Sequence, residues 1–211
     1  MKEKQLYKDY VKRLLDIFMA LGGLLGLSPV MVATAMLVRI KLGSPVIFTQ
    51  ERPGKIGKDG KEKIFRMYKF RSMTDERDEK GELLPDEVRL TSFGKKLRAT
   101  SLDELPEMFN ILKGDMAIIG PRPALWNQYD LIEERDKYGA NDILPGLTGW
   151  AQIHGRDELE IPEKAKLDGY YVENLSFGLD VKCFFGTILS VLRSDGVVEG
   201  GTGEMKRRGK K

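Results

Sequence analysis

An uncharged run of 22 residues from Ile17 to Val38, interrupted by Ser28-Pro29, is the feature that most limits how this chain can fold. At about 1.5 Å per residue the run would form a helix of roughly 33 Å, enough to cross a bilayer core of about 30 Å. Hydropathy alone therefore predicts a single transmembrane helix.

Two features favour a re-entrant helix instead. Basic residues flank the run on both sides, whereas a single span is expected to show a cation asymmetry; they are Lys2, Lys4, Lys8, Lys12 and Arg13 before it, and Arg39, Lys41, Arg52, Lys55 and Lys58 after it. Pro29 removes an amide donor and clashes with the carbonyl of Leu25, and the Ser28 hydroxyl can bond a freed carbonyl. We therefore expect residues 1–40 to form a membrane-inserted helix–break–helix whose ends lie on one side.

The composition limits the other classes of function. The 35 Lys and Arg residues against 32 Asp and Glu give a net charge of +3, and no basic run interleaved with aromatic residues predicts nucleic-acid binding. The single Cys183 excludes an internal disulfide framework. With 211 residues, the chain has room for the anchor and one catalytic domain over residues 41–196, followed by a basic tail at 197–211 that we expect to be disordered.

The domain is predicted to be mostly helical α+β. The segments "SPVIFTQERPG" and "KIFRMYKFRSM" alternate apolar and polar residues and predict a β-hairpin. "SLDELPEMFNILKGDM" has helical periodicity, and Pro162 suits the first turn of a further helix through Tyr171. The amphipathic segment "FGLDVKCFFGTILSVLR" could lie on a membrane surface or close the core, and the sequence leaves both open.

The adjacent carboxylates Asp103 and Glu104 are candidate catalytic residues. Capping offers another explanation, because Ser101-x-x-Glu104 has the pattern of a capping box. Pro106 weakens it, since with Ser101 as N-cap this proline would be the fifth helical residue, where its missing amide is needed.

Cationic residues nearby favour the functional explanation. Lys69 and Arg71 are two residues apart, hence on one face of a predicted strand. Arg122 lies in "GPRP", a loop whose prolines limit the entropy lost on binding an anion. Carboxylates for a divalent cation together with fixed Arg and Lys suit phosphoryl transfer, although no Walker A, kinase or GxGxxG motif occurs.

Several motifs resemble the bacterial sugar transferase family, the monotopic phosphoglycosyl transferases, and most of all its small members. These are "VIFTQERPG", "FRMYKFRSM", "TSLDELPEMFNILKGDMAIIGPRP", "PGLTGWAQIHGR" and "LDGYYVENLSFGLDVK". His154 departs from the pattern, since relatives mostly carry Asn or another small polar residue there. A lone His is more often a hydrogen-bonded loop residue than a metal ligand.

The resemblance implies that a sugar-1-phosphate moves from a UDP-sugar to undecaprenyl phosphate with release of UMP. In the family pattern Asp103 attacks the sugar-linked phosphorus and binds Mg²⁺, and Glu104 completes the dyad. It also implies that Lys69, Arg71, Arg98 and Arg122 hold phosphates or brace the dyad, with Asp168 a weaker candidate. The expected location is the cytoplasmic face of the bacterial inner membrane, without crossing it.

Two other functions remain open on the sequence. A membrane-tethered adaptor would bind a protein partner through its charged face and would tolerate Asp103→Asn. A UDP-sugar phosphodiester hydrolase would use the same residues but need no lipid acceptor. The sequence does not identify the sugar, the pathway or the oligomeric state.

Overall fold

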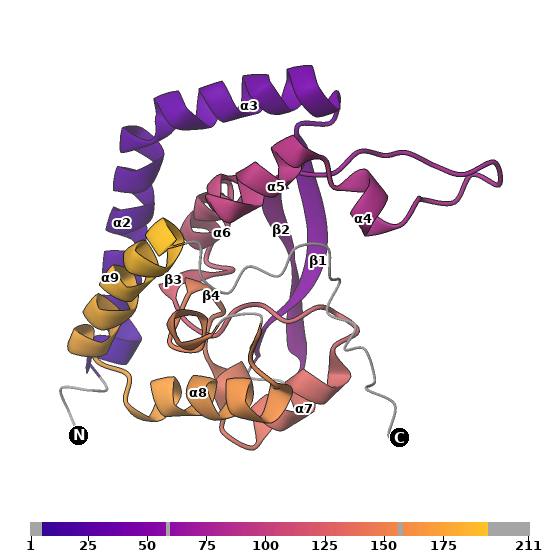
Figure 1. The fold of residues 1–211 in the computed structure, drawn as a ribbon. Helices are drawn as coiled ribbons and strands as arrows, with labels where there is room; N and C mark the ends of the chain where they lie inside the picture. The colour runs from indigo at the N-terminus through magenta and orange to yellow at the C-terminus, as the bar shows by residue number, and fades with distance from the viewer. Residues whose placement is uncertain (1–5, 58–59, 156–157, 194–211) are drawn as a thin grey trace.

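The computed structural model describes residues 6–57, 60–155 and 158–193. Its fold is mostly helical α+β, as predicted, with a β-hairpin and a second small sheet (Figure 1). The tail predicted at 197–211 lies outside the described residues.

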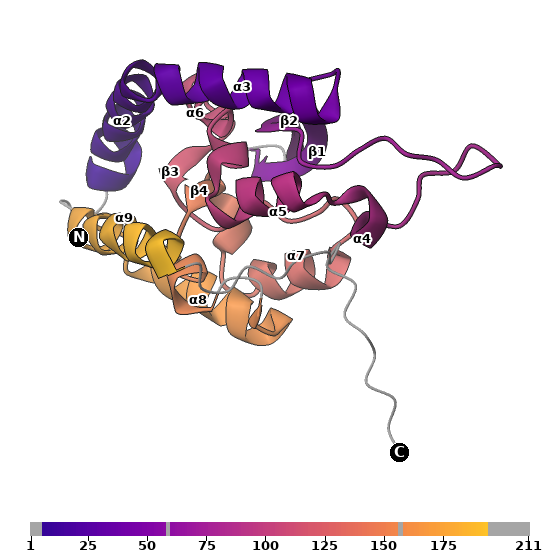
Figure 2. The ribbon, with the colours of Figure 1, turned by 45° about the horizontal axis from the view of Figure 1, so that its top comes forward.

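The apolar run forms two helices that meet at a sharp bend. They are α2 (Lys12–Gly26) and α3 (Ser28–Leu42), preceded by a π-helical turn at Tyr7–Val11, and their axes differ by 64°. Figures 1 and 2 show the pair wrapping around one edge of the molecule as an L. In the described part of the chain no single helix passes the length and hydropathy test for a membrane span, whereas this bent pair passes it as a broken span or re-entrant loop.

The break predicted at Ser28-Pro29 is confirmed, and its chemistry is local. Pro29 lies in the first turn of α3, where an amide has no intrahelical partner to lose. The Ser28 hydroxyl donates to the carbonyl of Leu25 over 2.8 Å, as expected for a carbonyl that the break leaves free. Since α3 continues to Leu42, the predicted domain boundary at residue 40 falls inside this helix.

The hairpin consists of β1 (Ile47–Ile56) and β2 (Glu62–Phe70), paired antiparallel with Ile47 opposite Phe70. This confirms the strands predicted from alternation. The side chains of Phe65 and Met67 on β2 are buried against the core.

The remaining elements follow the hairpin and surround it. They are α4 (Asp86–Arg89), α5 (Ser92–Ala99), a 3₁₀ turn (Leu102–Glu104), α6 (Glu107–Lys113), β3 (Ala117–Ile119), α7 (Tyr129–Asp136), β4 (Gly146–Thr148), α8 (Ile161–Glu173) and α9 (Phe177–Arg193), with short 3₁₀ turns at Ala140–Asp142 and Gln152–His154. Strand β3 pairs parallel with β4. The charged segment before α4 projects from the body as an arm (Figures 1 and 2).

Helix α2 belongs to the core as much as to the anchor. Ala20 is fully buried and packs with residues of the hairpin, α6 and β3. Arg13 donates to the carbonyls of Ile111 and Leu112 at the end of α6, over 2.7 and 3.1 Å. The Asp16 carboxylate accepts from the amide of Ile118 over 2.9 Å. The anchor and the domain are therefore joined by buried polar contacts as well as by packing.

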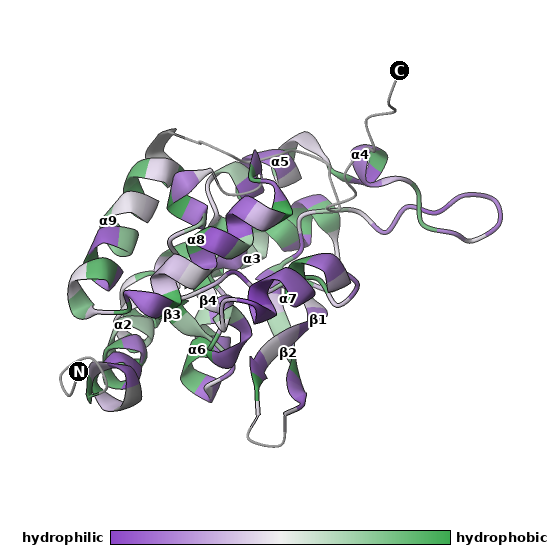
Figure 3. Cartoon of the chain, turned by 90° about the horizontal axis from the view of Figure 1, so that it is seen from below, coloured by the Kyte–Doolittle hydropathy of each residue, from purple (hydrophilic) through white to green (hydrophobic). Residues whose placement is uncertain are grey.

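Helix α9 has two different faces, and Figure 3 shows hydrophobic and hydrophilic residues alternating along it. Leu179 and Cys183 are buried and close the core. Phe177, Phe185 and Leu189 remain exposed. The question left open by the sequence is thus settled on one side: the helix does close the core, and it also leaves an apolar face outside.

Candidate active site

Asp103 and Glu104 lie in the 3₁₀ turn between α5 and α6, and both are buried, at 6% and 8% exposure. The capping explanation is wrong: Ser101 adopts a left-handed conformation, with φ of 54°, and its side chain caps nothing. Pro106 is instead the N-cap residue of α6. The two acids are therefore held in a tight bend rather than in the first turn of a longer helix.

Glu104 is the hub of the charged cluster. Its Oε1 accepts from Lys69 Nζ over 2.8 Å and from Arg122 Nη2 over 2.5 Å. Lys69 comes from β2 and Arg122 from the loop after β3, so one carboxylate oxygen joins three separate segments. The structure thus brings together Glu104, Lys69 and Arg122 from the predicted set.

Asp103 has a different environment from its neighbour. Burial raises the pKa of this carboxyl to about 6, and the charge of Glu104 adds to the rise. Lys69, Arg98 and Arg122 act in the opposite direction, so these three cations lie within electrostatic reach. In the described part of the chain no hydrogen bond to the Asp103 carboxylate is found. Asp103 is a buried acid near cations but left available for a ligand.

Glu107 is a third acid that the sequence analysis missed. It is 1% exposed, and its Oε1 lies 3.2 Å from Lys69 Nζ. Burial raises the pKa of Glu107 to about 7, helped by Glu104 and opposed by Lys69 and Arg122. The signal was available: Glu107 follows Glu104 by three residues, a spacing that places two side chains on one side of a helical turn.

Lys69 lies between Glu104 and Glu107 and stays protonated. Burial alone would lower its pKa, but Glu104 and Glu107 outweigh burial and the net effect is a raised pKa. The ammonium group therefore remains charged in an interior position.

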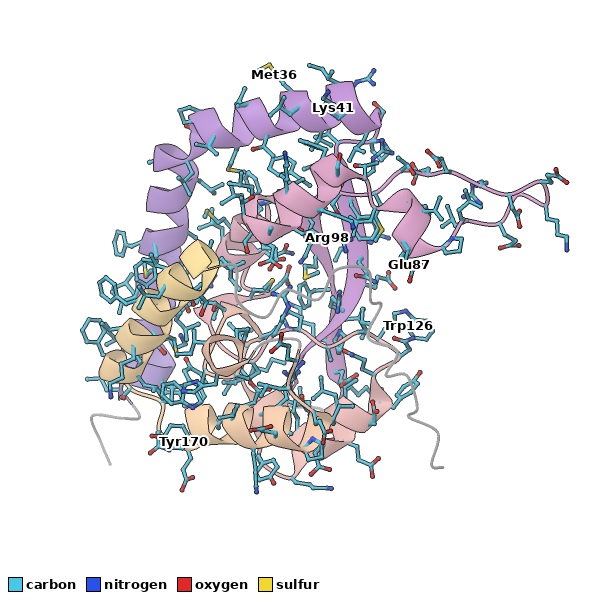
Figure 4. All side chains as sticks on the ribbon, viewed as in Figure 1. Met36, Lys41, Glu87, Arg98, Trp126 and Tyr170 are labelled. Carbon is cyan, nitrogen blue, oxygen red and sulfur yellow. The ribbon has the colours of Figure 1, made fainter. Side chains whose placement is uncertain are left out.

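Arg98 and Arg71 occupy different places. Arg98 points from α5 toward the hairpin and donates from Nε to the Ser72 hydroxyl over 2.9 Å (Figure 4). Arg71, just past the end of β2, donates to the carbonyl of Ser44 over 2.9 Å and to Asp75 over 2.6 Å. The structure thus brings Arg98 near Asp103 but directs Arg71 to the base of the projecting arm.

Asp168 is a brace behind the cluster. It is 1% exposed, accepts a hydrogen bond from Arg135 Nε over 2.8 Å and forms an ion pair with Arg135 Nη2 at 2.6 Å. Arg135, which the sequence analysis also missed, donates from Nη1 to the backbone carbonyl of Arg122 over 3.0 Å. Asp168 therefore acts on Arg122 through Arg135, and its own carboxylate faces an arginine.

The described residues contain no group of three or more His, Cys, Asp or Glu side chains that could hold a metal ion by themselves. Asp103 offers a single carboxylate, which suits a Mg²⁺ ion that takes its other ligands from substrate phosphates and water. His154 hydrogen-bonds through Nδ1 to the carbonyl of Trp150 over 2.8 Å, and the two rings lie 4.2 Å apart between centroids with their planes tilted by 44°. His154 is therefore a hydrogen-bonded residue, as expected, and it lies in a 3₁₀ turn.

Comparison with known proteins supplies the family. Residues 7–194 match the family model described as bacterial sugar transferase. The "uncharacterized sugar transferase EpsL" of Bacillus subtilis is 48% identical over 187 residues, which cover 89% of this chain and 90% of EpsL. The Aeromonas hydrophila UDP-N-acetylgalactosamine-undecaprenyl-phosphate N-acetylgalactosaminephosphotransferase is 39% identical over 197 residues, covering 89% of this chain and 45% of that protein.

A relative from Escherichia coli is named for a different sugar. Its UDP-glucose:undecaprenyl-phosphate glucose-1-phosphate transferase is 39% identical over 188 residues, 84% of this chain and 39% of that protein. The chain thus spans nine-tenths of EpsL and less than half of the other two. The match over most of its length, to the family and to EpsL, shows that this chain belongs to the bacterial sugar transferase family.

Proposed function

We propose that this protein transfers a sugar-1-phosphate from a UDP-sugar to undecaprenyl phosphate and releases UMP. The names of the Aeromonas and Escherichia relatives support both substrates. They differ in the sugar, so the donor of this chain is stated only as a UDP-sugar. The observation that carries the proposal is Asp103, a buried carboxylate whose pKa is influenced by the charges of Lys69, Arg98 and Arg122.

Asp103 is the proposed nucleophile. Its carboxylate oxygen attacks the sugar-linked phosphorus, the P–O bond to UMP breaks, and UMP leaves with the bridging oxygen. A phosphate oxygen of undecaprenyl phosphate then attacks the same phosphorus, breaks the bond to Asp103 and restores the carboxylate. No water and no redox partner is consumed. With a pKa of about 6, Asp103 is mostly ionised at neutral pH and can act without a general base.

The other charged residues lower the cost of bringing anions together. Lys69 and Arg122 are fixed on Glu104, which leaves their charge in place without reorganisation when the phosphates arrive. A Mg²⁺ ion bound by Asp103 and the substrate phosphates would neutralise part of the diphosphate charge. Asp168 and Arg135 hold the backbone of Arg122 and so fix its approach.

The bent anchor gives the site a fixed depth. We propose that α2 and α3 enter and leave the bacterial inner membrane on its cytoplasmic face. The 64° bend and the exposed apolar residues of α3 support this arrangement, among them Met36, which points away from the body (Figure 4). Because a lipid phosphate sits at headgroup level, an enzyme acting on it needs its cluster of cations at the same level.

The test is release of UMP by protein in nanodiscs with Mg²⁺ and a panel of UDP-sugars, with and without undecaprenyl phosphate. We expect lipid-dependent release from one sugar, abolished in Asp103→Asn and retained in Asp130→Asn, a matched change at an exposed residue of α7. Equal release without lipid would instead show a hydrolase. Binding of UDP without release from any donor would contradict the transferase, and absence of UDP binding would favour the adaptor.

A further inference from the structure

Arg52 is a cation of the hairpin that the reaction described above does not use. It lies on β1, where its backbone pairs with Phe65 of β2, and it is half-buried. Its Nη1 donates to the carbonyl of Pro123 over 3.3 Å, and its Nη2 donates to Gln50 Oε1 over 2.7 Å. Its head group therefore contacts the same Pro-bracketed loop that carries Arg122.

In the part of the chain that the structure describes, no carboxylate forms an ion pair with the Arg52 guanidinium. Its Nε is buried and has no hydrogen-bond partner. A guanidinium has five N–H donors, and the two bonds to Pro123 and Gln50 leave three without a described partner.

The surroundings of Arg52 make this deficit costly. The pKa of Arg52 is lowered to about 10, chiefly by burial and also by the charge of Arg122, while Glu107 and Glu104 oppose these effects. The group stays protonated at neutral pH, so the folded protein holds two neighbouring guanidinium groups in an environment that disfavours the charge of one of them. An anion placed between the loop and β1 would relieve the repulsion and fill the donors.

We infer that Arg52 is a substrate-binding residue that, with Arg122, grips a phosphate group. The ligand class is a phosphate ester, either the diphosphate of the nucleotide donor or the terminal phosphate of the lipid acceptor. The inference rests on the proposed function for the identity of these ligands. Guanidinium groups suit such a ligand because their planar donors pair with phosphate oxygens in a bidentate manner.

A structural role for Arg52 makes the opposite prediction about stability. If Arg52 mainly braced the loop at Pro123, its removal would lower the melting temperature of the ligand-free protein. If it waits for an anion, removing an uncompensated half-buried charge leaves that temperature unchanged or raises it, and lowers affinity for the ligand. Loss of Arg52 therefore lowers the melting temperature if its role is structural, and lowers ligand affinity without lowering the melting temperature if it binds an anion.

The experiment compares Arg52→Gln and Arg52→Lys with Arg66→Gln, a matched change on the same hairpin. Arg66 is exposed, and its contact with Glu51 is long, at 3.9 Å. UDP binding is measured by calorimetry on full-length protein in nanodiscs, together with the melting temperature without ligand. KM is then measured separately for the UDP-sugar that the panel identifies and for undecaprenyl phosphate.

We expect Arg52→Gln to weaken binding of one of the two substrates roughly tenfold or more without lowering the ligand-free melting temperature. Arg52→Lys, which keeps the charge but loses the fork, should fall between it and the wild type, and Arg66→Gln should match the wild type. Weaker UDP binding assigns Arg52 to the donor. Unchanged UDP binding with a raised KM for the lipid assigns it to the acceptor.

Two results would overturn the inference. One is unchanged UDP affinity and unchanged KM values in Arg52→Gln. The other is a lower ligand-free melting temperature in both Arg52 variants, with Arg52→Lys no better at binding than Arg52→Gln. Failure of the proposed function is a separate result, because wild-type protein would then bind UDP without releasing UMP from any donor, and the UDP comparison of the variants would still stand.

Discussion

Glu104 and Arg122 are joined by a 2.5 Å hydrogen bond between Oε1 and Nη2, and the same oxygen accepts from Lys69 over 2.8 Å. A neutral amide at position 104 would leave two cations without this shared charge. We expect Glu104→Gln to lower kcat/KM at least about 100-fold, because Lys69 and Arg122 both lose the carboxylate that fixes them at the site. The measurement is lipid-dependent UMP release.

The control for this change is Glu82→Gln on the projecting arm, where the side chain is exposed. It removes the same charge far from the cluster and should leave the rate unaltered. Wild-type kcat/KM in Glu104→Gln would show that the shared oxygen does not position the cations for catalysis.

Asp168 is expected to matter for stability and, through Arg135, for turnover. Asp168→Asn leaves Arg135 buried without its counter-charge, which costs about 3–5 kcal/mol of unfolding free energy for a broken buried pair. The Arg122 carbonyl then loses a fixed donor, so kcat should fall more than KM rises. Denaturant unfolding in detergent and steady-state kinetics measure the two effects.

A surface ion pair at the helix that carries Arg135 provides the comparison. Lys137 and Glu134 are 2.5 Å apart on α7 and its end, with Lys137 largely exposed. Glu134→Gln should cost about 0–1 kcal/mol, as is usual for surface pairs. Similar losses in the two variants would refute the assignment of Asp168 as a buried brace.

Glu107 should make stability depend on pH. Its pKa is about 7 in the folded protein against an ordinary value of 4.5, with burial as the main cause, so the folded state binds its proton more tightly than the unfolded chain. The stabilising contribution is therefore complete below about pH 4.5 and is lost as the pH rises through about 7. We expect Glu107→Gln to flatten the decline in unfolding free energy between pH 5 and 8.

Urea unfolding at several pH values tests this, with Glu82→Gln expected to keep the wild-type slope. Asp103 also has a raised pKa and contributes in the same direction, so some slope should remain. Parallel curves for the wild type and Glu107→Gln would show that Glu107 does not titrate in this range.

The re-entrant arrangement predicts which side of the membrane each end of the anchor faces. Lys8 and Lys41 are exposed residues near the start and end of the bent pair. In a Cys183→Ser background, Lys8→Cys and Lys41→Cys should both react with an impermeant maleimide in inverted vesicles, and neither should react in spheroplasts. Labelling of the two positions from opposite sides would exclude re-entry.

Straightening the bend gives the complementary result. Ser28→Ala with Pro29→Ala restores an amide and removes the hydroxyl that bonds the Leu25 carbonyl. We expect this double variant to place Lys41→Cys on the far side and to abolish UMP release. Val30→Ala, which keeps Pro29, should behave as the wild type.

Several features were predicted because they depend on local chemistry. The alternation of Ile64, Arg66, Tyr68 and Phe70 predicted β2, although the buried face also holds Phe65 and Met67 from the other set. The missing amide of Pro29 predicted the bend. Each rule involves only neighbouring residues. The two acids were singled out because Pro106 weakens the capping explanation and because Lys69, Arg71 and Arg122 supply cations for the same site. The structure brings Glu104 together with Lys69 and Arg122, two cations that the sequence predicted for the same site.

The residues whose positions the sequence did not predict correctly depend on tertiary packing. Lys69 and Arg71 were placed on one strand face, but β2 ends at Phe70 and the chain turns, so Arg71 bonds Ser44 and Asp75 instead. Arg135 lies in a charged helix without an apolar pattern, and only the fold shows that it is buried. Arg52 looked like a flanking cation because burial of a side chain on an edge of a hairpin cannot be read from its neighbours.

The contacts of Arg13 and Asp16 with α6 and β3 bear on how this protein can be produced. Removing the anchor at Gly43 would uncover Ile111 and Met108 and strip two carbonyls of their donor, so the truncated fragment is expected to aggregate rather than become a soluble enzyme. Solubilisation should instead keep α2 whole and replace outward-facing residues such as Phe18 and Met36 with polar ones. In this fold, the helix pair proposed to enter the lipid also holds α6 and β3 in place, and α6 directly follows the turn that carries Asp103.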